Sequence, residues 1–240
     1  MKFDKKGNNP VLAAGFLLKG LKLSLSPELR TFIIIPILIN IVLYSGAFAL
    51  GYFYVEDLIN QFIPGWLHWL RWILWPLFFI SFFIAGFFTF TVLANLIAAP
   101  FYGRLAAKTL AIITGQSVVS AEQPIPKVIG AELIRIGYFS TRALPLLLLS
   151  VIPGLNVLAP VLWALFGAWG MVLEYMAYPL ENEGLLFSEQ KQLLKSVRLG
   201  AISFGGLAVL GLTIPVLNLI VAPAAVIGGT IYFNAIKKEE

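Results

Sequence analysis

The chain has 240 residues, of which 59% are hydrophobic and only 12% are charged. A water-soluble domain carries about 25% charged residues, so this composition excludes an ordinary soluble globular protein. The net charge of +5 does not indicate nucleic-acid binding, because the basic residues form short clusters beside apolar runs, as in membrane loops. Cysteine is absent, which excludes a disulfide framework and a cysteine metal site. The sequence therefore predicts an all-α integral membrane protein.

A short amphipathic helix is predicted over residues 10–25. The apolar residues at helical spacing are Leu12, Phe16, Leu17, Leu21 and Leu25, while Lys19 and Lys22 share the opposite side. We expect this helix to lie in the headgroup layer of the bilayer.

The next helix is predicted to begin at Ser26-Pro27-Glu28. Ser is a good N-cap, Pro suits the first helical position, and Glu favours the first turn. Free backbone N–H groups at such a start attract anions. Arg30, one turn in, adds a planar fork of donors suited to a tetrahedral oxyanion. The alternative is an ordinary capped helix whose Arg30 reaches lipid phosphates.

Four long segments contain no Asp, Glu, Lys or Arg. They cover residues 31–55, 72–103, 143–173 and 199–236, with lengths of 25, 32, 31 and 38 residues. A helix needs about 20 apolar residues to cross a bilayer, so each of the first two segments accommodates one crossing. We expect two long transmembrane helices at residues 29–54 and 72–99, within a single membrane domain over residues 1–240.

The loop between these spans is predicted over residues 56–71. Four tryptophans spaced by three lie at its end, namely Trp66, Trp69, Trp72 and Trp75, and tryptophan concentrates at membrane interfaces. His68 is the only histidine, and its position among them predicts an interface residue rather than a catalyst. The second span is predicted to close at the run from Asn95 to Pro100.

The last two uncharged segments are broken by one repeated pattern. Ile152-Pro-Gly-Leu-Asn156 and Ile214-Pro-Val-Leu-Asn218 follow Arg135 and Arg198 by similar distances. Pro-broken internal repeats are typical of transporters, although the pattern also makes a simple turn. A central turn leaves about 14 residues on each side of the first segment, too few for two crossings. Residues 143–173 and 199–236 are therefore predicted to form re-entrant helical hairpins, which implies a homo-oligomer or a pore.

The basic residues are distributed unevenly about these predicted elements. With two spans and two re-entrant hairpins, 16 of the 17 Lys and Arg residues fall on one side, and only Arg71 lies opposite. The positive-inside rule makes that side cytoplasmic.

Motifs of catalysis are missing from the sequence. It contains no GxxxxGK[ST] phosphate loop, no GxSxG elbow, no HExxH and no metal-ligand cluster. We therefore expect no enzyme activity, no catalytic residues, no cofactor, no metal, no nucleic-acid partner and no ATP-driven transport by this chain alone.

Several short motifs occur in the order found in one membrane family. They are Pro27-Glu-Leu-Arg-Thr-Phe32, Ile35-Pro-Ile-Leu-Ile-Asn40, Asn95-Leu-Ile-Ala-Ala-Pro-Phe101, Ile152-Pro-Gly-Leu-Asn156, Phe166-Gly-Ala-Trp169, Tyr178-Pro-Leu-Glu-Asn182 and Ile214-Pro215 with Asn218 and Pro223. In these motifs the chain resembles the CysZ-type sulfate permeases of the bacterial inner membrane over nearly its whole length. The resemblance implies a multi-pass protein of that membrane that assembles into oligomers and takes up sulfate for cysteine synthesis.

The resemblance also implies a sulfate site. A Gly-Leu-Arg motif, often with a second Arg, is associated with sulfate in this family, and it maps onto Glu28, Leu29, Arg30 and Thr31. This chain replaces the small residue by a carboxylate and the second cation by a hydroxyl, so Glu28 repels sulfate unless it turns away or pairs with Arg30. The expected ligand is sulfate or a related oxyanion. We expect the protein to transport this ion passively or coupled to another ion. The alternative is a membrane scaffold or accessory protein that transports nothing itself.

Overall fold

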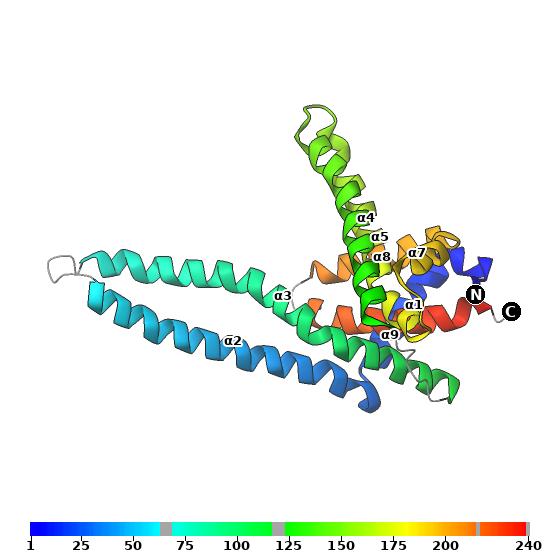
Figure 1. The fold of residues 1–240 in the computed structure, drawn as a ribbon, viewed down its shortest axis with the longest axis horizontal. Coiled ribbons are helices and arrows are strands. Elements are labelled where there is room, and N and C mark those ends of the chain that lie inside the picture. The colour runs from blue at the N-terminus through cyan, green and yellow to red at the C-terminus, as the bar shows by residue number, and fades with distance from the viewer. Residues whose placement is uncertain (63–68, 117–122, 215–216, 239–240) are drawn as a thin grey trace. The chain divides into compact units, whose positions relative to one another are not determined.

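The computed structural model describes residues 1–62, 69–116, 123–214 and 217–238. The chain divides into two compact units, one formed by Met1–Ile33 with Tyr102–Glu240 and the other by Ile34–Phe101. Figure 1 shows the helices of both units. A single membrane domain over the whole chain stays a prediction.

Helices account for nearly all of the described structure. In chain order they are the short 3-10 helix η1 (Lys5–Asn8), α1 (Pro10–Ser24), α2 (Pro27–Phe62), α3 (Arg71–Thr114), α4 (Ile125–Val151), η3 (Asn156–Leu158), α5 (Ala159–Tyr175), α6 (Ala177–Asn182), α7 (Phe187–Lys195), α8 (Arg198–Leu212) and α9 (Asn218–Ile236). Strands β1 (Lys2–Phe3) and β2 (Lys237–Lys238) pair antiparallel. The prediction of an all-α protein is confirmed at the level of fold class.

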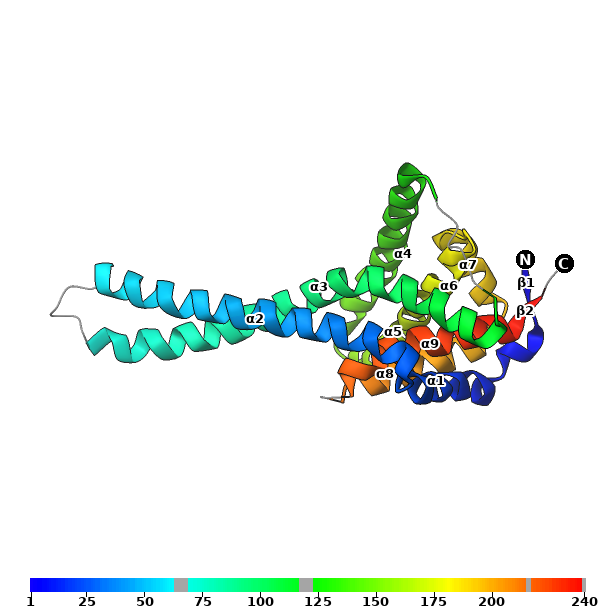
Figure 2. The ribbon, with the colours of Figure 1, turned by 90° about the horizontal axis from the view of Figure 1, so that it is seen from below.

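The unit Ile34–Phe101 is a pair of long helices. Within it α2 and α3 run side by side (Figures 1 and 2), and aromatic rings join them. The ring centroids of Phe48 and Phe82 are 5.1 Å apart, as are those of Tyr52 and Trp75. Offset and edge-on aromatic pairs stabilise by about 0.5–1.5 kcal/mol beyond their buried area, so these ring contacts help to hold the two helices together.

Both long helices extend beyond their predicted ends. Residues 56–62, expected in a loop, form the last turns of α2. The expected end at Pro100 is wrong, because α3 continues to Thr114. Proline is tolerated inside membrane helices, where neighbouring groups satisfy the freed carbonyl. Trp66 and His68 lie outside the described residues.

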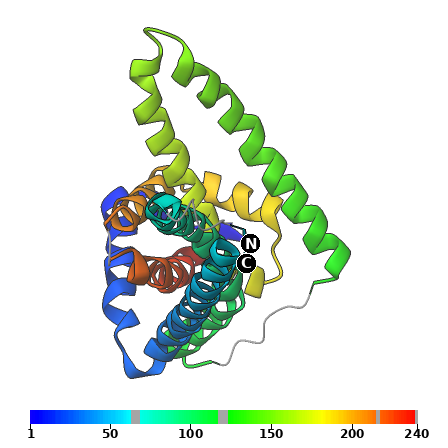
Figure 3. The same cartoon turned by 90° about the vertical axis from the view of Figure 1, so that its left-hand side faces the viewer.

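The predicted turn at Pro153-Gly154 is confirmed. Gly154 has a φ of +83°, a conformation that costs glycine little because it lacks a Cβ atom. The N–H of Asn156 donates to the carbonyl of Ile152 at 3.0 Å, which closes the turn. Figure 3 shows α4 and α5 as the two arms of a hairpin that meet at this turn. The matching turn at Pro215 lies outside the described residues.

The number of long apolar helices differs from the predicted two. Among the described residues three stretches are long and apolar enough to cross a membrane, and they are Pro27–Tyr54, Pro126–Val151 and Asn156–Asn182. The α4 arm of the hairpin is longer than expected because the charged segment before position 143 belongs to the same helix. In α3 only Trp72–Phe82 belongs to a described apolar stretch, of shorter length.

Small residues allow close packing in the unit formed by Met1–Ile33 and Tyr102–Glu240. A Cβ atom on Gly20 of α1 would lie 2.2 Å from the carbonyl oxygen of Ala224 in α9. A Cβ atom on Gly205 of α8 would lie 1.9 Å from the carbonyl oxygen of Ala168 in α5. Backbones therefore meet directly at both crossings, as is common between helices in membranes.

Helix α1 occurs where it was predicted, and its packing face includes Phe16 and Leu17 of the expected apolar side but not Leu12 or Leu25. Its buried residues are Ala13, Phe16, Leu17, Gly20 and Ser24, whereas Leu12 and Leu25 of the expected apolar side are exposed. This face packs on α9 and α8. That α1 lies in the headgroup layer of the bilayer, with its exposed side toward the lipid headgroups, stays a prediction.

The two ends of the chain lie together (Figure 2). Strand β1 pairs with β2 so that Lys2 faces Lys238, and Nζ of Lys238 lies 3.7 Å from a carboxylate oxygen of Asp4. The hydroxyl of Tyr232 in α9 donates to the carbonyl of Gly7. These contacts fix η1 and the start of α1 against α9.

Candidate anion-binding site

The predicted anion site lies at the tight corner between α1 and α2. The N–H of Ser26 donates to the carbonyl of Leu23 at 3.0 Å, which closes the turn after α1. Helix α2 then begins at Pro27, as the sequence predicted, because proline lacks the N–H that a first helical residue would leave unpaired.

Leu29 holds this corner in place. Its side chain is completely buried and belongs to the apolar core, whereas Glu28, Arg30 and Thr31 are exposed. Burying a leucine side chain stabilises a fold by about 1.5–3 kcal/mol. The structure therefore places Leu29 as an anchor that fixes the start of α2, and leaves the three polar residues at the surface.

The hydrogen bonds of the helix start differ from the expected cap. The carbonyl of Ser26 accepts from the N–H groups of Leu29 at 3.2 Å and Arg30 at 3.0 Å. The hydroxyl of Ser26 is buried and has no partner among the described residues, so it does not cap the helix. Because the N–H of Leu29 is engaged, the first turn offers an anion chiefly the N–H of Glu28, which has no acceptor in the described part of the chain.

The spacing of the charged residues separates Glu28 from Arg30. Residues two apart on a helix do not face each other, so the carboxylate of Glu28 and the guanidinium of Arg30 diverge. Thr31, three residues after Glu28, lies on the side of Glu28 rather than beside Arg30. An anion beside Arg30 would thus meet the charged fork, with the carboxylate and the hydroxyl on another side of the helix.

The fold also joins charged groups whose proximity the sequence did not indicate. A guanidinium nitrogen of Arg135 in α4 donates to the carboxylate of Glu174 in α5, and another lies 3.6 Å from Glu132. Farther along, Arg142, Lys195 and Arg198 converge around one cavity. The sequence carried little signal for this second group, because Lys195 ends α7 and Arg198 begins α8. The two helices are bent by 108° at the break between them, so helical spacing does not relate these two residues.

The outer faces of the helices define the class of the protein. Large apolar side chains are exposed along α2, at the hairpin of α4 and α5 and at the end of α8, among them Val42, Phe53, Leu148, Val151, Val157 and Leu210. Soluble monomers rarely expose contiguous apolar patches above a few hundred Å². Together with three helices of membrane-spanning length, these faces define a helical membrane protein.

Comparison with known proteins places the chain more narrowly. It belongs to the family described as sulfate transporter CysZ/etoposide-induced protein 2.4, whose model matches residues 16–223. It is 42% identical to the sulfate transporter CysZ of Pseudomonas fluorescens strain Pf0-1, over 93% of this chain and 94% of that protein. The sulfate transporters CysZ of Pseudomonas syringae pv. tomato and Pectobacterium atrosepticum are 42% and 38% identical, over 91% and 90% of this chain and 90% and 82% of theirs.

Proposed function

We propose that this protein takes up sulfate across the bacterial inner membrane, without ATP hydrolysis of its own, and so supplies cysteine synthesis. The observation that carries the proposal is the similarity of about 40% identity to sulfate transporters over nearly the whole chain. The exposed Arg30 at the start of α2, fixed by the buried Leu29, offers an oxyanion a positioned bidentate donor. Sulfate or a related oxyanion is thus the ligand of residues 28–31.

The test is flux by the protein alone. Purified protein in liposomes should carry radiolabelled sulfate down its gradient faster than empty vesicles do, with no ATP present. An imposed proton or sodium gradient then separates channel-like transport from ion-coupled transport. Flux equal to that of empty vesicles would instead favour a scaffold or accessory protein that assists another transporter.

The membrane arrangement that we propose has two full crossings, α2 and α3, and two hairpins that enter part-way. The apolar part of α4 after Arg142 is nine residues long, or about 14 Å at 1.5 Å per residue. The hydrocarbon core is about 30 Å thick, so this tip reaches only half-way unless Arg142 and Arg135 are drawn into it. Partly inserted backbone must be covered by protein, which supports assembly into a homo-oligomer within the bilayer.

Cysteine labelling tests this arrangement in a chain that has no cysteine of its own. Lys127→Cys and Lys191→Cys should react with an impermeant thiol reagent from the cytoplasmic side, and Asn60→Cys from the opposite side. Asn156→Cys, at the tip of the α4–α5 hairpin, should be protected from both sides. Labelling of Asn156→Cys from the same side as Asn60→Cys would mean that the hairpin crosses completely.

A further inference from the structure

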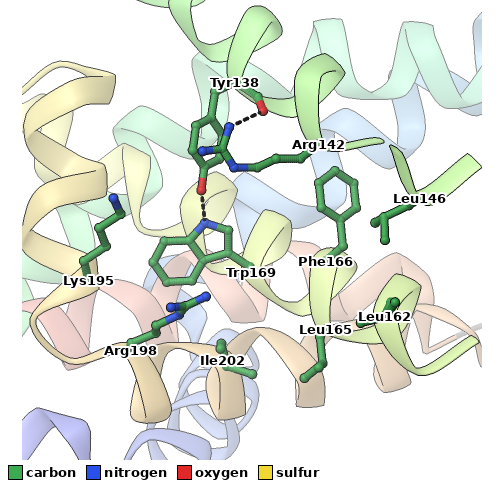
Figure 4. A pocket seen from close by; sticks show the side chains of 10 residues that line it. All are labelled: Tyr138, Arg142, Leu146, Leu162, Leu165, Phe166, Trp169, Lys195, Arg198 and Ile202. Carbon is green, nitrogen blue, oxygen red and sulfur yellow. Dashed lines mark hydrogen bonds between the residues drawn. The ribbon is translucent and has the colours of Figure 1, made fainter. Parts of the chain in front are cut away.

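A cavity of about 570 Å³ lies between α4, α5, α7 and α8, in the unit that contains both ends of the chain. Helix α4 contributes Tyr138, Arg142 and Leu146, helix α5 contributes Leu162, Leu165, Phe166 and Trp169, and α7 and α8 contribute Lys195, Arg198 and Ile202. Figure 4 shows that these side chains come from separate elements and gather around one space. The cavity does not include residues 28–31, so it is separate from the site proposed above.

The charged residues of this cavity are all cations. Arg142, Lys195 and Arg198 line it, and no Asp or Glu occurs among the described lining residues. Elsewhere in the same unit cations are paired with carboxylates, as Arg135 is with Glu174 and Lys237 is with Glu183 at 2.8 Å. Three like charges around one space raise its electrostatic potential, which attracts an anion.

The two arginines are held by aromatic rings rather than by acids. The guanidinium carbon of Arg142 lies 3.7 Å from the ring centroid of Tyr138, and its Nη1 donates to the carbonyl of Tyr138 at 3.0 Å. The guanidinium carbon of Arg198 lies 5.9 Å from the ring of Trp169. Cation–π contacts position a cation without neutralising it, so most guanidinium donors stay available to a ligand.

Tyr138 adds a neutral donor to the same space. Nε1 of Trp169 donates to the hydroxyl oxygen of Tyr138 at 2.9 Å, a contact drawn in Figure 4. Because the phenol oxygen accepts this bond, its own proton remains for donation to a ligand. Two guanidinium forks, an ammonium and a hydroxyl form a donor set that suits a tetrahedral oxyanion.

The remaining wall of the cavity is apolar. It is formed by Leu146, Leu162, Leu165, Phe166 and Ile202, and Figure 4 shows Leu146, Leu162 and Leu165 grouped away from Lys195. On α4 the cavity spans the change from charged residues before position 143 to the apolar tip. Basic pockets between membrane helices at this level bind the phosphates of anionic lipids, and an acyl chain would cover the leucines.

We propose that this cavity is a second oxyanion site, which binds either free sulfate or the phosphate of an anionic lipid. Its existence does not require that the protein transports sulfate, because occupancy is measured as binding. If the occupant is free sulfate, the inference deepens the proposed function by adding a second binding position for the transported ion. If the occupant is a lipid phosphate, the cavity binds a structural partner from the bilayer.

The test uses purified, delipidated protein in a neutral detergent at low ionic strength. One arm measures binding of radiolabelled sulfate in an Arg30→Ala background, which weakens the site at the start of α2. The other arm measures adducts of phosphatidylglycerol by native mass spectrometry, with phosphatidylcholine as the zwitterionic comparison. The variants are Arg198→Ala, Lys195→Gln and their combination. The matched control is Arg104→Ala, which removes one exposed positive charge of α3 outside the cavity.

Each cavity variant should lower the affinity for the probe that binds, sulfate or phosphatidylglycerol, about tenfold to a hundredfold, as expected for one charge-assisted hydrogen bond. Arg104→Ala should change that affinity by no more than about twofold. A response to sulfate assigns the free ion, and a response to phosphatidylglycerol but not to phosphatidylcholine assigns the lipid. Thermal unfolding of each variant excludes loss by misfolding, and Arg142→Gln gives an independent check on α4. The proposal is overturned if neither probe binds, or if the cavity variants bind as Arg104→Ala does. Sulfate flux in the proteoliposome assay stays the separate test of transport.

Discussion

Gly205→Ala should abolish or strongly destabilise the folded state, although it adds only one methyl group. The added Cβ atom would lie 1.9 Å from the carbonyl oxygen of Ala168 and 3.0 Å from the backbone nitrogen of Val172. These atoms belong to the backbone of α5, so no side-chain rotation relieves the overlap. Overpacking typically costs about 1–3 kcal/mol and occasionally more, and separation of two helices places this change at the upper end. Thermal unfolding in detergent, followed by tryptophan fluorescence, measures the loss.

The neighbouring glycine supplies the control. A Cβ atom on Gly206 would lie 3.7 Å from the Cβ atom of Ala168, an ordinary van der Waals distance. Both glycines lie in α8, so alanine improves helix propensity equally at each, by up to about 1 kcal/mol. Gly206→Ala should therefore keep or raise the unfolding temperature. Equal midpoints for the two variants would show that α5 and α8 do not meet at this crossing.

Arg30→Ala should weaken sulfate binding about tenfold to a hundredfold. A charge-assisted hydrogen bond contributes about 1.5–3 kcal/mol, and each 1.4 kcal/mol corresponds to a factor of ten in affinity. Arg30→Lys should recover only part of the loss, since an ammonium lacks the bidentate fork. Calorimetry or radioligand binding at low ionic strength measures the affinities. Assembly and unfolding temperature should not change, because Arg30 is exposed.

The opposite change is expected at the preceding acidic residue. Glu28→Gly should strengthen binding by removing a negative charge close to the anion, but only modestly, because Glu28 and Arg30 lie on different sides of the helix. Salt should reduce the difference, since exposed charges are screened beyond about 10 Å at 0.1 M ionic strength. Equal sulfate affinity in the wild type and Arg30→Ala would leave an ordinary helix start, with its arginine directed at lipid headgroups.

The sequence predicted features that depend on local chemistry. The start of α2 at Pro27 and the turn at Gly154 follow from local backbone preferences, because proline suits the first helical position and glycine accepts a positive φ. Both occur as expected. Pro100 did not mark the end of α3, which continues to Thr114. The cost of a proline inside a helix depends on what surrounds the freed carbonyl. Local signals therefore located helix starts and turns better than helix ends.

Features that depend on contacts between distant parts of the chain could not be predicted from the spacing of apolar and charged residues. The apolar side predicted for α1 contained the buried Phe16 and Leu17, but the sequence did not indicate that Gly20 meets α9 backbone to backbone. Leucine has little preference between lipid and a protein core, whereas close approach requires small residues. Likewise the convergence of Arg142 and Arg198 depends on the packing of α4 against α5 and of α5 against α8. Helical spacing indicated shared faces but not which faces meet.

The contact of α1 with α9 also determines when this protein can finish folding. Asn218, the first residue of α9, follows Ser24, the last of α1, by 194 positions. At translation rates of about 5–20 residues per second, roughly 10–40 s pass between the synthesis of the two helices. During that interval Phe16 and Leu17 lack their native cover, because the ring stacked on Phe16 belongs to Tyr232 of α9.

The nascent N-terminal helix must therefore rest in lipid or against another protein until the ribosome has completed the last helix. The pairing of β1 with β2 and the bond between Tyr232 and Gly7 form only after that point. A chain halted before α9 would expose the face of α1 around Gly20 to any helix with a small residue at its surface. The core therefore assembles only in the finished polypeptide. If synthesis is interrupted, α1 remains exposed and prone to non-native contacts, and such chains must be degraded.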